Sequence, residues 1–174
     1  MTVFARSIGA VLFYLLLGEF AVAQTNDVKC QPVSSTGTAQ TLRCDGGIII
    51  TAENGAQYKL NDTNHDGRVD SVELGGQAIL LEVPKVPKGK RFTVTTPQAI
   101  AAVRGTKWAV DTTGQKTSVF VVNGRVSVGR RSPANRQSVM LGPGEGVDVE
   151  GTAPLVVKRW APARVAALMA RLGQ

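Results

Sequence analysis

The chain is poor in the side chains that most enzymes use for acid–base and nucleophilic chemistry. It contains one histidine, His65, and two cysteines, Cys30 and Cys44, among 174 residues. A Ser–His–Asp or Cys–His arrangement would have to use His65, which lies within an acidic run. No glycine-rich loop ahead of a helix offers a phosphate cradle. The sequence therefore predicts a binding protein and not an enzyme. A hydrolase that uses paired carboxylates is the weakest hypothesis.

Aromatic residues are also scarce, and charge is unevenly spread. Phe, Trp and Tyr make up 5% of the chain, and the net charge is +7. Residues 24–83 contain 4 Lys/Arg and 8 Asp/Glu, whereas residues 84–174 contain 15 Lys/Arg and 4 Asp/Glu. The basic part lacks the aromatic platform that single-stranded nucleic acid needs, so we expect no nucleic-acid partner. An acidic protein, anionic lipid head groups or acidic polysaccharide fit this charge, and so does a merely solvated basic surface.

Long hydrophobic runs are absent after the amino terminus. Arg6 precedes an apolar run from Ile8 to Leu17, and Ala21-Val22-Ala23 has the small-x-small pattern of a cleavage site. We predict a signal peptide at 1–23, cut before Gln24, and a periplasmic or secreted product without a membrane span. The alternative is an uncleaved anchor, which the short run disfavours because a span needs about 20 residues.

The cysteine count is even, and both cysteines follow the predicted cleavage site. Export favours a disulfide between Cys30 and Cys44, closing a loop of about 15 residues. Their spacing does not suit a CxxC redox pair, and no further Cys or His cluster supports zinc. Residues 24–45 are rich in Ser, Thr and Gly, which predicts a polar lead-in held by this disulfide.

Apolar residues recur mostly with period two in short runs, which predicts an all-β fold. Turn residues separate the runs, so we expect an antiparallel sandwich or a stacked β-coil of short strands. Asn123-Gly124 favours a tight hairpin over 118–128. Residues 84–91 contain two prolines and a glycine, and predict either a linker between lobes or a long basic loop. Residues 161–174 show helical spacing after Pro162, which predicts one short carboxy-terminal helix packed on the sheet.

Residues 62–73 match the spacing of a calcium-binding loop. The predicted ligands are the side chains of four acids and one amide, with one backbone carbonyl: Asp62, Asn64, Asp66, Arg68 (carbonyl), Asp70 and Glu73. Gly67 stands where such a loop turns sharply. The flanking residues look like strands and not like the helices of an EF-hand. The pattern therefore predicts calcium between two strands, or a polar turn without metal whose order depends on neighbouring lysines.

A longer motif lies in the basic half. It comprises Thr96-Pro97, Val103-Arg104-Gly105-Thr106, Trp108, Val110, Gly124, Val126, Val128, Leu141 and Gly144-Glu145. This set resembles the FecR domain family over residues 92–150. From the residues alone, Trp108 is expected in the core, and Arg104 either pairs with a carboxylate inside the fold or marks a partner surface.

The resemblance implies an all-β periplasmic signalling domain of about residues 46–160. Members that regulate iron uptake hold a sigma factor through a cytoplasmic segment. Only seven residues precede the apolar run here, so we expect no sigma-binding segment of this kind. The leading hypothesis is an exported module that binds an envelope protein, in signalling or iron-uptake regulation. The alternative is a calcium-stabilised structural or glycan-binding envelope protein.

Overall fold

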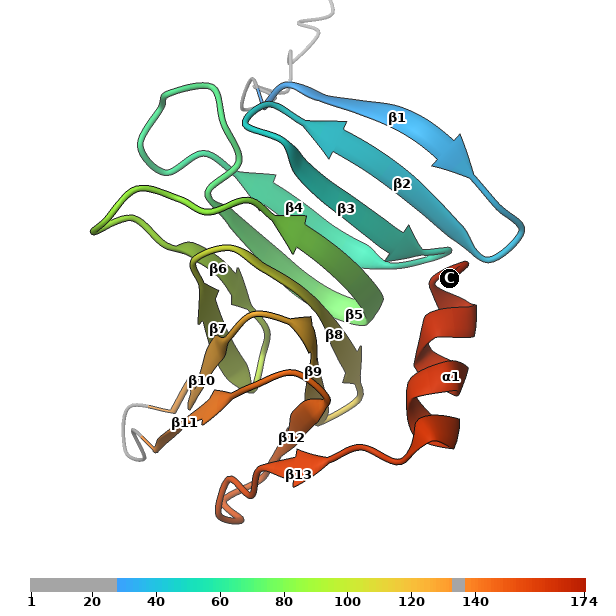
Figure 1. The fold of residues 1–174 in the computed structure, drawn as a ribbon, viewed down its shortest axis with the longest axis vertical. Helices are drawn as coiled ribbons and strands as arrows, with labels where there is room; N and C mark the ends of the chain where they lie inside the picture. Colours follow the sequence, from blue (N-terminus) through green and yellow to red (C-terminus); the bar gives the residue numbers. More distant parts are fainter. Residues whose placement is uncertain (1–27, 133–136) are drawn as a thin grey trace, which may run out of the picture.

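The structure is a computed structural model, and it describes residues 28–132 and 137–174 (Figure 1). The predicted signal peptide, residues 1–23, lies outside the described residues. The elements are β1 (Cys30–Ser35), β2 (Ala39–Cys44), β3 (Ile48–Glu53), β4 (Gln57–Asn61), β5 (Ser71–Val83), β6 (Phe92–Thr95), β7 (Ala99–Val103), β8 (Thr106–Thr113), β9 (Lys116–Asn123), β10 (Val126–Arg130), β11 (Ser138–Leu141), β12 (Glu145–Glu150), β13 (Lys158–Arg159) and α1 (Pro162–Arg171).

The long strand β5 belongs to two sheets and joins them. Residues 71–76 pair with β4, and residues 71–73 also pair with β6, whereas residues 77–83 pair with β8 and residues 79–82 with β3. Between these halves lie Gly75 and Gly76, followed by Gln77 at φ 67°. We call β1, β2, β3, the second half of β5, β8, β9, β12 and β13 the helix-side sheet. The open sheet consists of β4, the first half of β5, β6, β7, β10 and β11.

The hydrophobic core fills the space between the two sheets. Its fully buried members come from both, and the largest are Trp108, Phe92, Ile50, Leu74 and Ile79. After β3, every second connection carries the chain from one sheet to the other, beginning with β3–β4. The predicted all-β fold with one short helix is confirmed. The curled sheet combines features of a sandwich and a coil, and among the described strands only the β5–β6 pair is parallel.

The predicted hairpin over 118–128 is wrong. The turn at Asn123-Gly124 exists, with Gly124 at φ 91°, but β9 pairs with β8 and β12, while β10 pairs with β7 and β11. The physical reason lies in burial. Residues 117–121 of β9 are buried on both faces, whereas β10 alternates between buried and partly exposed positions. The turn therefore leads from a strand covered on both faces to a strand of the open sheet.

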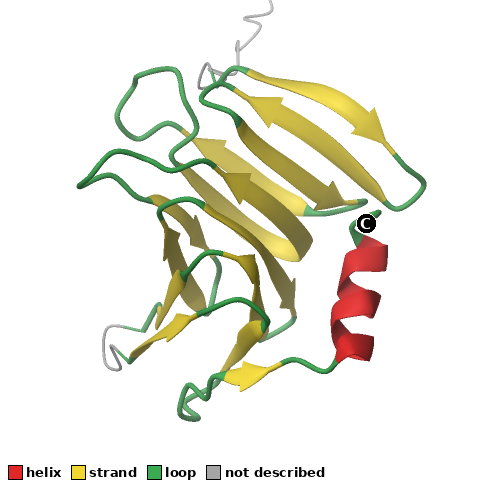
Figure 2. Ribbon diagram, in the orientation of Figure 1, coloured by secondary structure: helices red, strands yellow, loops and turns green. Residues whose placement is uncertain are grey.

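The helix α1 covers the outer face of the helix-side sheet (Figure 2). Leu168 and Leu172 are buried there against Ala78, Leu80 and Phe120. The predicted apolar stripe of the helix is therefore part of the core. Among the described residues, no helix is long and apolar enough to cross a membrane.

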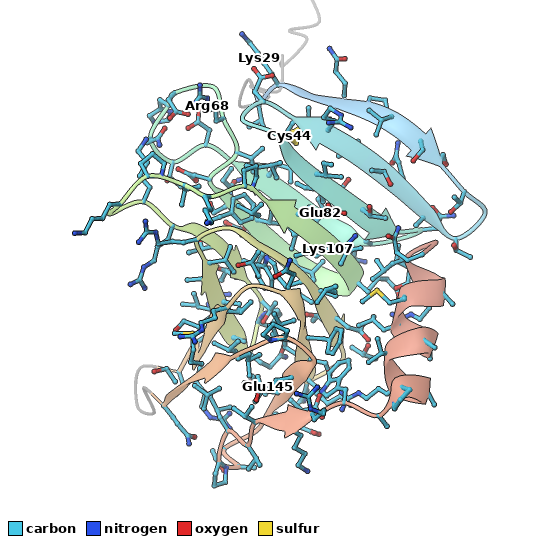
Figure 3. All side chains as sticks on the ribbon, viewed as in Figure 1. Lys29, Cys44, Arg68, Glu82, Lys107 and Glu145 are labelled. Carbon is cyan, nitrogen blue, oxygen red and sulfur yellow. A yellow bond between two sulfur atoms is a disulfide. The ribbon has the colours of Figure 1, made fainter. Side chains whose placement is uncertain are left out.

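The predicted disulfide between Cys30 and Cys44 is present. The two residues are direct partners at the ends of β1 and β2. Cys44 lies at the end of β2, where its partner in the neighbouring strand β3 is Ile48 (Figure 3). The polar segment expected as a lead-in thus contributes two strands, because β2 pairs along its whole length with β3 and buries Ala39 and Cys44.

Candidate partner-binding surface

The turn between β6 and β7 is built on Thr96. This side chain is 2% exposed, and its hydroxyl accepts from the Ala99 amide at 2.9 Å. It also shares a 2.8 Å hydrogen bond with the Thr117 hydroxyl of β9, which links the two sheets. Pro97 lies exposed in the same turn. The Thr-Pro part of the motif therefore closes one end of the core.

The opposite end of the core is closed by two connections between the sheets, β7–β8 at Gly105 and β9–β10 at Gly124. We call these two connections the corners. Gly105 has φ 92°, and a Cβ there would lie 2.7 Å from Lys85 Cγ. Gly124 has φ 91°, and a Cβ there would lie 2.8 Å from the Gly105 carbonyl oxygen. The buried Thr106 hydroxyl donates to the Arg125 carbonyl at 3.2 Å. Only glycine fits both corners, because they stack on each other and on the loop at 84–91.

Arg104 differs from the other motif residues. Trp108 is fully buried, as expected, and Thr96 and Thr106 are also buried. Arg104 is exposed, and its Nη2 donates to the Val86 carbonyl at 3.5 Å. Of the two alternatives for Arg104, the pairing with a carboxylate inside the fold is therefore wrong. The corner points the side chain outward, where it joins the loop at 84–91.

This arrangement gathers basic side chains at one end of the molecule. We call the set the basic end, and it consists of Lys85, Lys88, Lys90, Arg91, Arg104 and Arg125, all exposed. Two carboxylates offset charge near it: Asp66 lies 3.6 Å from Lys90, and Glu82 lies 2.7 Å from Lys107 (Figure 3). Of the six basic-end cations, only Lys90 forms an ion pair within the described part of the chain. The surface therefore keeps a strong positive charge.

A shallow groove of about 510 Å³ lies beside these corners. Its lining includes the corner residues Gly105 and Gly124 together with Pro84 and Lys85. On its other side lie Gly47 and Ile49. An extended segment or a loop of a partner fits such an open groove, with cations along one side.

The predicted calcium loop lies next to the basic end. In Figure 1 the loop between β4 and β5 lies beside the loop between β5 and β6, and both line one cavity of about 190 Å³. The carboxylate of Asp62 accepts from the amides of Asp66 and Gly67. Desolvation works to raise the pKa of Asp62, but these backbone hydrogen bonds hold it below its ordinary value. Asp66 pairs with Lys90 of the neighbouring loop.

The other predicted ligands are also engaged within or beside the loop. Asn64 accepts from the Asp66 amide, Asp70 accepts from Thr63, and Glu73 accepts from Asn61. Arg68 donates its amide to Asp66, and its exposed side chain runs beside Gly46 and lines the same cavity. In the described residues, no three or more His, Cys, Asp and Glu side chains are grouped so as to hold a metal ion. Calcium binding at this loop remains a prediction.

Sequence reasoning missed the ion pairs that fasten α1. Arg171 bonds both Glu53 and Asp111, with its shortest contacts at 2.6 and 2.7 Å. The hydrogen bonds that Arg171 donates to the carboxylates of Glu53 and Asp111 raise the pKa of Arg171 above its usual range. Arg164 bonds Asp148 at 2.5 Å. The spacing of seven between the two arginines puts them on one helical face, which is the signal that could have found them.

Four of the five aromatic side chains in the described residues are buried or covered and offer no stacking platform for a sugar, and the fifth, Tyr58, is half-buried. Trp108 is fully buried, and so are Phe92 and Phe120. Trp160 is covered on both sides, because Phe120 stacks on it at 5.0 Å and the Arg164 guanidinium lies 3.6 Å from its ring centre. This arrangement does not favour the glycan-binding alternative.

Comparison with known proteins identifies relatives at the level of family and fold. The sequence profile of the family described as FecR protein matches residues 32–127. No curated protein sequence matches the chain. Two crystal structures from Parabacteroides distasonis ATCC 8503, both described as a candidate anti-sigma factor, have a TM-score of 0.61 and 22% identity. They cover 81% and 80% of this chain, which spans only 65% and 64% of theirs.

Proposed function

Because the chain belongs to the FecR protein family, we propose that it is an exported signalling module that binds an acidic partner protein of the cell envelope through its basic end. The observation that carries this proposal is the state of Arg104. The motif corner fixes the backbone at this residue, yet the core does not use its side chain. The corner thus displays the side chain beside five other exposed cations.

Two further observations support a regulatory protein over an enzyme. The two similar structures are described as a candidate anti-sigma factor, which is a regulatory role. The single histidine, His65, is exposed in the acidic loop and lies in none of the cavities described above. Arginine and lysine at a protein surface set the rate and specificity of association with an acidic partner.

The experiment is a pull-down from envelope extract at moderate salt. The variant Lys88→Gln/Arg91→Gln/Arg104→Gln removes three exposed cations that form no ion pair. The matched control, Lys29→Gln/Arg43→Gln/Lys59→Gln, removes the same charge from other strands and loops. We expect one protein that binds the parent and the control, is lost from the basic-end variant, and is released as salt increases. Equal recovery with both variants would refute the proposal.

A further inference from the structure

We propose a second, separate site: a pocket that binds an oxyanion, meaning a carboxylate or a phosphate, at the end of the molecule opposite the basic end. The pocket has a volume of about 490 Å³. Four chain segments form it, namely the β6–β7 turn, the β8–β9 turn, the end of β10 and the turn after β12. Its lining is Pro97, Gln98, Gln115, Arg130, Arg131, Ser132 and Gly151.

The charge of this lining is entirely positive. Two arginines line the pocket, and no Asp or Glu does. Arg130 is 9% exposed, and no carboxylate pairs with it in the described residues. Its guanidinium donates instead to the carbonyls of Glu150, Gly151 and Ala153, and its Nε is buried without a partner. A desolvated cation that only carbonyl dipoles neutralise attracts an anion to the adjacent space.

Two side chains that line the pocket, Gln98 and Arg131, keep hydrogen-bond donors available for a ligand. The Gln98 Oε1 already accepts from Thr117 at 2.8 Å, and its Nε2 donates one hydrogen to the Gly114 carbonyl. The second Nε2 hydrogen remains for a ligand. Arg131 is exposed and uses Nη1 on the Thr96 carbonyl at 3.3 Å, which leaves the other edge of its planar fork. Such a fork matches the two oxygens of a carboxylate or phosphate.

A buried threonine cluster holds Gln98, one of the residues that line the pocket. Thr117 and Thr96 are buried, with 0% and 2% exposure, and the hydroxyls of Thr96, Thr112 and Thr117 form one hydrogen-bonded chain. This chain fixes Gln98 through Thr117, so its amide is oriented before any ligand arrives. Preorganised donors bind an anion without the entropic cost of ordering side chains. The Thr-Pro part of the motif thus supports a binding site as well as a turn.

The test is calorimetric titration of the purified protein with two probes, inorganic phosphate and a short peptide of two glutamates. The two probes distinguish a phosphate from a carboxylate source. We expect the Arg131→Gln variant to bind the preferred probe about tenfold more weakly than the parent. Arg131 is exposed, so this variant should keep the fold, whereas Arg130→Gln also removes the bonds to the 150–153 turn. The matched control is Arg43→Gln, which removes one exposed arginine that lies in neither the pocket nor the basic end.

Each outcome decides the proposal. Weaker binding in Arg131→Gln alone, with NMR shifts at the Gln98, Gln115 and Gly151 amides, supports the pocket. Weaker binding in Arg43→Gln alone, equal weakening in both variants, unchanged binding in both, or no binding of either probe to the parent overturns it. This test is independent of the proposed partner, because loss of partner capture in the basic-end variant does not depend on Arg131.

Discussion

The glycines of the motif allow the chain to turn between the sheets, whereas most of its other residues are buried in the core. Gly105 illustrates this, because its positive φ and its contact with Lys85 both exclude a side chain. We predict that Gly105→Ala lowers the free energy of unfolding by about 2–3 kcal/mol, through backbone strain and displacement of the 84–91 loop. Urea denaturation measures the effect.

The matched control is Gly114→Ala in the β8–β9 turn. Gly114 also has positive φ, at 59°, but no atom lies within 4 Å of the position a Cβ would take. Only the backbone strain applies there, so we expect a loss of about 1 kcal/mol. Equal losses at the two glycines would contradict the stacked-corner account.

Asp148 makes the attachment of the helix sensitive to acid. Burial works to raise its pKa, but hydrogen bonds from Arg164 and Ser118 outweigh burial and leave the pKa below its ordinary 3.8. A lowered pKa in the folded state means that the stabilisation is complete above pH 3.8 and is lost as pH falls through the folded pKa. We predict that Trp160 fluorescence changes in this acidic range. In Asp148→Asn the contribution of this carboxylate to the pH dependence should be absent, and an unchanged titration curve would contradict the assignment.

Among the elements, α1 stabilises the helix-side sheet by packing on its outer face. Leu168 is 4% exposed and packs beside Leu172 in the outer cluster. We predict that Leu168→Ala lowers the free energy of unfolding by about 2–3 kcal/mol, from lost burial and the cavity left behind. Ala166→Ser, at an exposed position of the same helix, serves as the control. A loss as large in the control would contradict the packing account, because Ala166 is exposed and its side chain buries no comparable apolar surface.

The loop at 62–73 carries the calcium prediction. Its oxygens now bond amides and side chains of the loop, so a bound ion would have to replace several of these hydrogen bonds. The sequence pattern predicts that millimolar calcium raises the melting temperature, because binding to the native state stabilises it. Magnesium at the same concentration is the control. An unchanged melting temperature removes the site.

Element type was largely predictable from the sequence, whereas pairing was not. Pro162 and Gly173 indicate the helix, and Asn123-Gly124 indicates a turn. These signals are local. The choice of sheet for β9 and β10 depends on α1, whose contacts with β9 come from more than 40 residues away. The burial of Arg130 likewise has no local signal, because the turn at 150–153 surrounds it only in the folded chain.

For the whole molecule, the uneven charge does not divide the fold into two lobes. The strongest acidic run and the basic loop at 84–91 are adjacent, joined by the Asp66–Lys90 pair and a common cavity. The acidic run precedes β5 and the basic loop follows it, and β5 runs through both sheets around a single core. The basic end is therefore a local surface on a rigid scaffold, and a partner has to match its geometry as well as its charge.

The most direct test of recognition through the basic end is photo-crosslinking in cells. These cells express the full chain with a photoreactive amino acid at position 88 or position 43. Both sites are exposed, but only Lys88 lies in the basic end. The account predicts one discrete protein adduct at position 88, weakened by Arg91→Gln/Arg104→Gln, and none at position 43. Adducts that are equal at both positions, or an adduct at position 88 that survives the two substitutions, would contradict recognition through this surface.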